Sequence, residues 1–149
     1  MLVRYMPLAM RWTKLNTTFD AEPNAPDPRV SVQGDVVRVR FFLNPFIWDD
    51  VQDDDEAELT FESVTKYRLG STNDEGFYRG QCRFSNTGIA WGNFYELSES
   101  GWQNSFPGDG VVVSEPNTTA LKHYLFYFRD ETFECIAHRY EFRRLGRGT

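Results

Sequence analysis

The residues whose type and spacing point most directly to chemistry are the two histidines of the chain, His123 and His138. They lie in two consecutive segments, 121–129 and 132–143, in which apolar and polar residues alternate as in a β-hairpin. With residues 130–131 at the tip of this hairpin, the register places the two imidazoles directly opposite each other. Facing Cβ atoms lie about 4.5–5.5 Å apart, so one metal ion is within reach of both side chains. The pair is therefore a candidate metal site.

A catalytic metal site on this pair requires a third protein ligand, and the sequence names none. Glu134 is on the same strand as His138, but about 13 Å away along a strand that rises about 3.3 Å per residue. We therefore favour the alternative that the histidines form a polar pair on the wetter face of the hairpin. The opposite face, on which Phe126 is expected to face Cys135, is apolar and is assigned to the core. No cofactor is predicted.

A run of acidic residues is the second candidate site. Eight carboxylates lie between residues 49 and 62, and the centre of the run comprises Asp50, Asp53, Asp54 and Asp55. Their spacing does not match the alternate acidic positions and following glycine of an EF-hand loop. A run of like charges is most often a solvated, self-repelling loop. The functional alternatives are a looser calcium site and a docking patch for a basic protein partner, of which we favour the docking patch.

Trp91 and Tyr95 form a third candidate site. They lie four residues apart in the strand-like segment 89–97, so both are expected to project from the same face of a strand. Aromatic rings on one face either pack against a second layer of structure or line a pocket for an apolar or sugar ligand. Packing is the favoured interpretation, and the pocket remains the alternative.

The overall composition restricts the classes of partner. A formal net charge of −6 disfavours binding to nucleic acid and to anionic membranes, which need a basic surface, and it permits a basic protein partner. No segment approaches the roughly 20 apolar residues of a membrane-spanning helix. The first residues lack the apolar stretch of a signal peptide, and Cys82 and Cys135 are expected to be two reduced thiols. These features predict a cytoplasmic protein.

The distribution of strand and turn signals predicts an all-β or mostly β fold. The chain contains 13 Phe, 7 Tyr and 4 Trp, residue types that suit pleated, half-buried strands. About eight to ten short strands, separated by turn residues, predict an antiparallel sandwich or a small barrel that ends in the hairpin 121–129/132–143. The one weak helix candidate is 45–56. We expect a single domain over residues 1–149, with a flexible tail at 145–149.

No motif identifies a family or a reaction, so catalysis is the less favoured outcome. The first hypothesis is a non-enzymatic interaction module that docks a protein through the acidic run or an exposed aromatic edge. The second is a barrel that encloses a small apolar ligand among Trp and Phe side chains. The third is a metal-dependent enzyme built on His123 and His138. The sequence predicts no particular oligomeric state.

Overall fold

The predicted β architecture is confirmed by the computed structural model, which describes residues 11–70, 89–98 and 121–147. These ranges contain nine β-strands and no helix, so the helix candidate 45–56 is a turn-rich loop that leads into a strand. No helix in the described part of the chain is long and apolar enough to span a membrane. The strands are β1 (Arg11–Lys14), β2 (Arg29–Gln33), β3 (Val36–Phe42), β4 (Asp55–Glu62), β5 (Lys66–Gly70), β6 (Phe94–Ser98), β7 (Lys122–Tyr127), β8 (Thr132–Ala137) and β9 (Arg139–Arg147).

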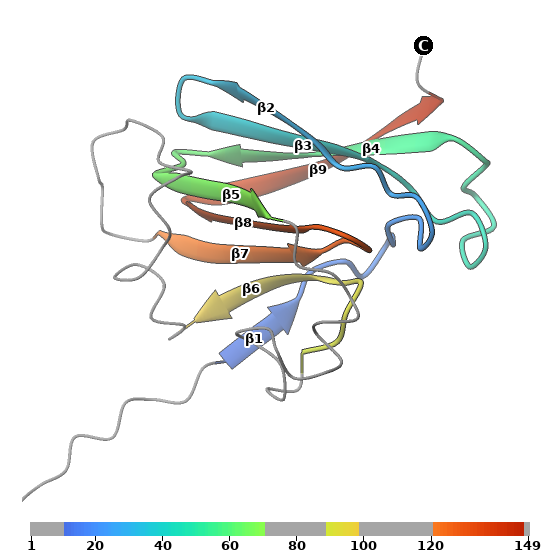
Figure 1. Cartoon of the computed structure of the whole chain (residues 1–149), viewed down its shortest axis with the longest axis horizontal. Helices are drawn as coiled ribbons and strands as arrows, with labels where there is room; N and C mark the ends of the chain where they lie inside the picture. The colour runs from blue at the N-terminus through green and yellow to red at the C-terminus, as the bar shows by residue number, and fades with distance from the viewer. Residues whose placement is uncertain (1–10, 71–88, 99–120, 148–149) are drawn as a thin grey trace, which may run out of the picture.

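The strands form two antiparallel sheets that pack face to face (Figure 1). The five-stranded sheet has the order β1-β6-β7-β8-β5, and the four-stranded sheet has the order β2-β3-β4-β9. Among the described strands each sheet keeps two edges, β1 and β5 in the first and β2 and β9 in the second. The described strands therefore form a sandwich, and the predicted alternative of a closed barrel is wrong.

Strand β3 shows why these sequences form half-buried strands. Val37, Val39 and Phe41 alternate with arginines, and all three apolar side chains are fully buried. Successive side chains of a strand point to opposite faces, so the alternation buries one face and leaves Arg38 and Arg40 on the other. The same alternation in β4 pairs Leu59 with Val39 and sets the register between these two strands.

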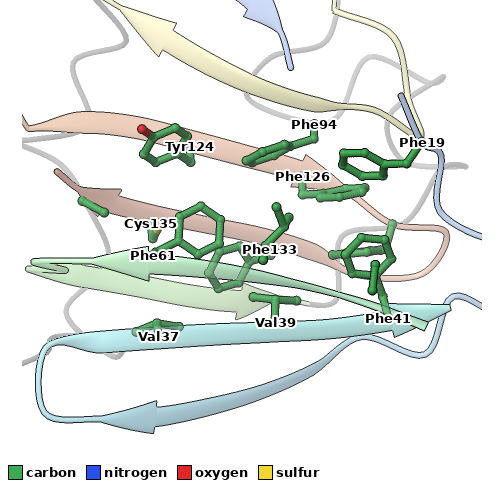
Figure 2. Packing of buried hydrophobic residues seen from close by; sticks show 14 of the residues in the cluster. Phe19, Val37, Val39, Phe41, Phe61, Phe94, Tyr124, Phe126, Phe133 and Cys135 are labelled. Atoms are coloured by element: carbon green, nitrogen blue, oxygen red, sulfur yellow. The ribbon is translucent and has the colours of Figure 1, made fainter. Parts of the chain in front are cut away.

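Aromatic rings from both sheets meet in the core between them (Figure 2). Phe126 of β7 stacks on Phe128 at 4.0 Å between ring centroids and contacts Phe41 of the opposite sheet at 5.3 Å. Phe61 of β4 contacts Tyr124 of β7 at 5.3 Å. Each fully buried side chain of this size contributes about 1.5–3 kcal/mol to folding relative to an exposed one. Many of the described aromatic residues thus join the two sheets.

The C-terminal hairpin forms, but its register differs from the prediction by two residues. His123 lies opposite Ile136 instead of His138, and Phe126 lies opposite Phe133 instead of Cys135. The faces are as predicted, because a shift of two residues preserves the side on which each side chain projects. The tip is Arg129–Asp130, one residue earlier than expected, since the backbone nitrogen of Phe128 donates to the carbonyl oxygen of Glu131 at 2.9 Å.

The predicted second strand of this hairpin, 132–143, is two strands that belong to different sheets. β8 ends at Ala137, the chain bends at His138, and β9 continues in the four-stranded sheet. A similar corner joins β4 to β5 at Ser63, which has a φ of 54°. β9 also runs further than predicted, because residues 145–147 continue it, and Gly146 and Arg147 pair with the start of β4 after a shift in register. Residues 145–147 therefore belong to strand β9 and not to the predicted flexible tail.

Candidate functional site

Four connections gather at one end of the sandwich, at the right in Figure 1. They are the segments 15–28, 43–54 and 89–93 and the tip of the β7–β8 hairpin. Between them opens a cleft of about 260 Å³, whose lining includes an acidic part with Asp20, Glu22 and Asn44. Trp91 and Tyr127 form an aromatic part of the same lining. Loops at one end of a rigid sandwich are the usual place for binding sites, so this end is the candidate functional end of the molecule.

The acidic wall of the cleft is held by a short β-bridge. Ala21 pairs with Leu43, the backbone nitrogen of Asn44 donates to the carbonyl oxygen of Asp20 at 2.8 Å, and that of Glu22 donates to Phe42 at 2.9 Å. Residues two apart on an extended chain project to the same side. The bridge therefore directs the Asp20 and Glu22 side chains along one wall.

Both carboxylates on this wall are held by neutral donors. Asp20 accepts hydrogen bonds from Asn16 Nδ2 at 3.0 Å and from Trp48 Nε1 at 2.9 Å. Glu22 accepts one from the backbone nitrogen of Asn24 at 3.0 Å and a second from the backbone nitrogen of Ala25. Among the described residues, neither carboxylate forms an ion pair. The two negative charges are thus oriented by neutral groups, and no described cationic side chain pairs with them.

The aromatic wall consists of Trp91 stacked on Tyr127, with ring centroids 4.4 Å apart and an interplanar angle of 23°. Gly92 follows with a φ of +90°, a conformation that other residues rarely adopt, so the chain turns sharply after the indole. Asn16, which is 2% exposed, joins the two walls because its amide nitrogen donates to Asp20 and also to Asn93 Oδ1 at 2.9 Å.

Trp91 therefore lines a cleft, as one of the sequence-based alternatives expected, but Tyr95 does not share that cleft. The Tyr95 hydroxyl donates to the carbonyl oxygen of Ala90 at 3.1 Å and accepts from the nitrogen of the same residue at 2.9 Å. Its ring packs edge-on against Trp12 at 5.5 Å. Tyr95 thus fixes the backbone just before Trp91 and is buried, which agrees with the packing interpretation.

The acidic run divides into two structurally different parts. Asp50, Asp53 and Asp54 are exposed on the loop that precedes β4, and Asp50 is paired with Arg144 at 2.8 Å. Asp55 begins β4, and its carboxylate accepts from the backbone nitrogen of Gln52 at 2.8 Å, which closes a turn. Of the four predicted binding aspartates, only Asp53 and Asp54 are therefore both exposed and without an ion pair to another described residue.

The later carboxylates of the run lie on the outer face of the four-stranded sheet. Glu58 is surrounded by three arginines, with Arg143 at 3.2 Å, Arg40 at 3.3 Å and Arg38 at 3.9 Å. Glu56 pairs with Arg29 in the same layer. These carboxylates form cross-strand ion pairs and have a structural role in the four-stranded sheet.

An exposed apolar pair, which the sequence analysis did not single out, lies in the same loop as the free aspartates. Phe46 is 69% exposed and Ile47 is 64% exposed. The loop around them is nevertheless anchored, because Val51 is buried, Trp48 donates to Asp20, and the backbone nitrogen of Phe46 donates to Asn44 Oδ1 at 2.7 Å. A signal was present: two large apolar residues directly follow Asn44-Pro45, where the chain must turn.

The two histidines do not form a pair. His123 is buried on the outer face of the five-stranded sheet, and its Nε2 lies 3.1 Å from Glu134 Oε2. His138 is exposed at the corner between β8 and β9, beside a shallow hollow lined by Glu62 and Arg139. The hydrogen bond from Arg139 lowers the pKa of Glu62. The predicted facing imidazoles are therefore wrong, and no group of three or more potential metal-ligating side chains occurs in the ranges that the structure describes.

The cysteines offer little for nucleophilic catalysis. Cys135 is completely buried, and this burial raises the pKa of its thiol well above the ordinary value. It projects into the core, whereas His123 projects to the opposite face of the hairpin. A buried protonated thiol without an adjacent base is inert. Cys82 lies outside the described residues.

Comparison of the chain with models of protein families, with curated proteins and with solved structures gives no match.

Proposed function

We propose that this chain is a non-enzymatic interaction module that docks a basic protein through the loop of residues 44–54, which we call the docking loop. The observation that carries the proposal is the exposure of Phe46 and Ile47 side by side on an anchored loop. Large exposed apolar side chains that are close together and rimmed by polar residues are typical of protein interaction sites.

The charge around the apolar pair defines the kind of partner. Asp49, Asp53 and Asp54 are exposed on the same loop. None of these three carboxylates forms an ion pair with another described residue. A basic surface meets this rim with complementary charge, which raises the association rate and disfavours acidic partners. The partner surface we expect is therefore apolar at its centre and rich in Lys and Arg around it.

The rigidity of the docking loop favours affinity. The side chains of Trp48 and Val51 anchor it from within, and the turn closed by Asp55 holds its end. A loop that is already ordered loses less conformational entropy on binding than a mobile one. The exposed pair is thus presented in a defined position.

The other two hypotheses have less support. A barrel for an apolar ligand does not fit a sandwich whose two sheets are joined by contacting aromatic rings. A metal-dependent enzyme loses its basis because His123 and His138 lie apart. A cytoplasmic location is part of our proposal and fits the free thiol of Cys135, since unpaired thiols are common in reducing compartments.

Selection from a random peptide display library tests the proposal with a defined probe. The immobilised protein is expected to enrich peptides that combine aromatic or aliphatic residues with Lys and Arg. A Phe46→Ser/Ile47→Ser variant is expected to lose binding of the selected peptides, and an Asp49→Asn/Asp53→Asn/Asp54→Asn variant to bind them about tenfold more weakly at low salt. If the selected peptides bind both variants with the same affinity as the wild type, the docking loop is not their binding site.

A further inference from the structure

We propose that the cleft beside the docking loop receives an arginine side chain of the basic partner, a step that rests on the proposed function because it names what the partner inserts. The cleft and the docking loop share Ile47, which is exposed on the loop and also lines the cleft. A side chain that enters the cleft therefore comes from a partner already in contact with the loop.

The charge of the cleft selects a cation. Asp20 and Glu22 line it, both are partly shielded from solvent, and the described residues give neither an ion-pair partner. Their hydrogen bonds come from amide, indole and backbone N–H groups, which fix the carboxylates without cancelling their charge. A carboxylate accepts up to about four hydrogen bonds, so both retain capacity for a ligand.

The aromatic part of the lining selects a planar cation. Trp91 stacks on Tyr127, and both residues line the cleft. A guanidinium group is flat, is weakly hydrated, stacks on aromatic rings and donates in a fork that matches a carboxylate. An ammonium group shares the charge but not the planar fork, so arginine is preferred over lysine.

The size of the cleft limits the ligand to a single side chain. Its volume of about 260 Å³ is below the roughly 300–1,000 Å³ of pockets that hold drug-sized ligands. Arg129 also lines the cleft and donates from Nη1 to the carbonyl oxygen of Asn24 at 2.9 Å. Its positive charge offsets one of the two carboxylates, so the cleft remains negative.

The test uses N-acetyl-L-arginine amide as the probe, added to the full chain and followed by NMR of the tryptophan indole N–H groups, with Trp91 assigned from a Trp91→Phe variant. We expect saturable shifts of the Trp91 indole signal with a Kd in the range of about 1–10 mM, as for other ligands of this size. N-acetyl-L-citrulline amide, which has the same shape without the charge, is expected to bind at least about tenfold more weakly.

Variants separate the cleft from unspecific charge effects. Glu22→Gln is expected to weaken binding of the arginine probe about fivefold or more, whereas Glu141→Gln, which removes an exposed carboxylate on β9, leaves it unchanged. Equal binding of the citrulline probe, or unchanged binding by Glu22→Gln, would overturn the proposal. Preferential binding of the lysine analogue or of a methyl glucoside would also overturn it, in favour of an ammonium or a sugar site.

The failure of this inference is distinguishable from the failure of the proposed function. Phe46→Ser leaves the lining of the cleft intact and is expected to abolish peptide docking while the arginine probe still binds. Loss of docking in Phe46→Ser with no binding of the arginine probe by the wild type keeps the docking loop and removes the cleft. Binding of the arginine probe by the wild type, together with unchanged peptide docking by Phe46→Ser, keeps the cleft and removes the docking loop.

Discussion

Glu58 Oε1 lies 3.2 Å from Arg143 Nη2 across the β4–β9 pair, and the Glu58 side chain is only 8% exposed. The same carboxylate also attracts Arg38 and Arg40 of β3. One buried charge thus joins three adjacent strands on the outer face of the four-stranded sheet. A buried carboxylate of this kind is costly to remove because its partners lose charge-assisted hydrogen bonds together.

Replacing Glu58 by Gln is expected to lower the free energy of unfolding by about 1–3 kcal/mol, because three arginines lose their common counter-charge. Urea denaturation at low ionic strength measures the change. Glu141→Gln on the neighbouring strand removes an equal charge from an exposed site and is expected to change stability by less than about 0.5 kcal/mol. Equal effects of the two changes would show that Glu58 acts only through net charge.

Phe126 and Phe46 are the same residue type in the core and on the surface, so truncating each of them tests the assignment of the core. Phe126 is fully buried and contacts rings of both sheets, whereas Phe46 is 69% exposed. Truncating Phe126 to Ala is expected to cost about 3–5 kcal/mol, as for other buried phenylalanines. Phe46→Ala is expected to leave the urea midpoint nearly unchanged. A large loss of stability in Phe46→Ala would mean that the docking loop is part of the core and not a free surface.

Side-chain alternation was sufficient to predict the faces of the strands but not the pairing between them. The faces of β3 and of the C-terminal hairpin follow directly from the positions of Val37, Val39 and Phe126 in a period of two. The position of the hairpin tip does not follow from this alternation, which is the same for both registers, and the tip also carries a contact that is distant in sequence, from Arg129 to the carbonyl oxygen of Asn24 across 105 positions. The predicted imidazole pair depended on that tip, so it was wrong while the faces were right.

The cleft could not be predicted from the sequence, because contacts between distant segments orient its lining residues. Asp20 and Glu22 lie in a segment with three prolines that carries no periodic pattern, and the bridge to Leu43 orients them. Trp91 was identified because aromatic residues in the predicted strand 89–97 have few roles, either packing or binding, although the strand begins only at Phe94 and Trp91 lies in the turn before it. Its partner Tyr127 comes from β7 and could not be assigned without the sheet order.

Gly34 in the β2–β3 turn predicts a backbone effect. It has a φ of +61°, which follows from the two-residue connection between Gln33 and Val36. Gly34→Ala is expected to destabilise the protein by about 1 kcal/mol, although a Cβ there meets no neighbouring atom within 4 Å. Gly70→Ala is the control, since Gly70 has an ordinary φ and a new Cβ would lie near only the flexible Arg68 side chain. Thermal unfolding that ranks Gly70→Ala as the worse variant would contradict the assigned turn.

Cys135 predicts how stability depends on pH in the alkaline range. Burial holds the pKa of its thiol well above its ordinary value, so the folded state keeps the proton that the unfolded state releases. The contribution of the buried thiol to the free energy of unfolding is therefore fully present below the ordinary thiol pKa. It falls as the pH rises above that pKa, by at most about 1.4 kcal/mol per pH unit for one group. Urea denaturation between pH 8 and pH 10 measures this slope.

The matched variant for this slope is Cys135→Ala, which keeps an apolar side chain at the site and removes the titrating group. Burial also raises the pKa values of Tyr124 and Tyr140, so part of the alkaline loss persists in the variant, at higher pH. The difference between the two slopes isolates the thiol. It should coincide with protection of Cys135 from alkylation in the folded protein, measured by mass spectrometry of its peptide, because only the thiolate is a nucleophile. Identical slopes together with rapid alkylation at pH 8.5 would mean that Cys135 is reached by solvent, which is incompatible with the packed aromatic core around it.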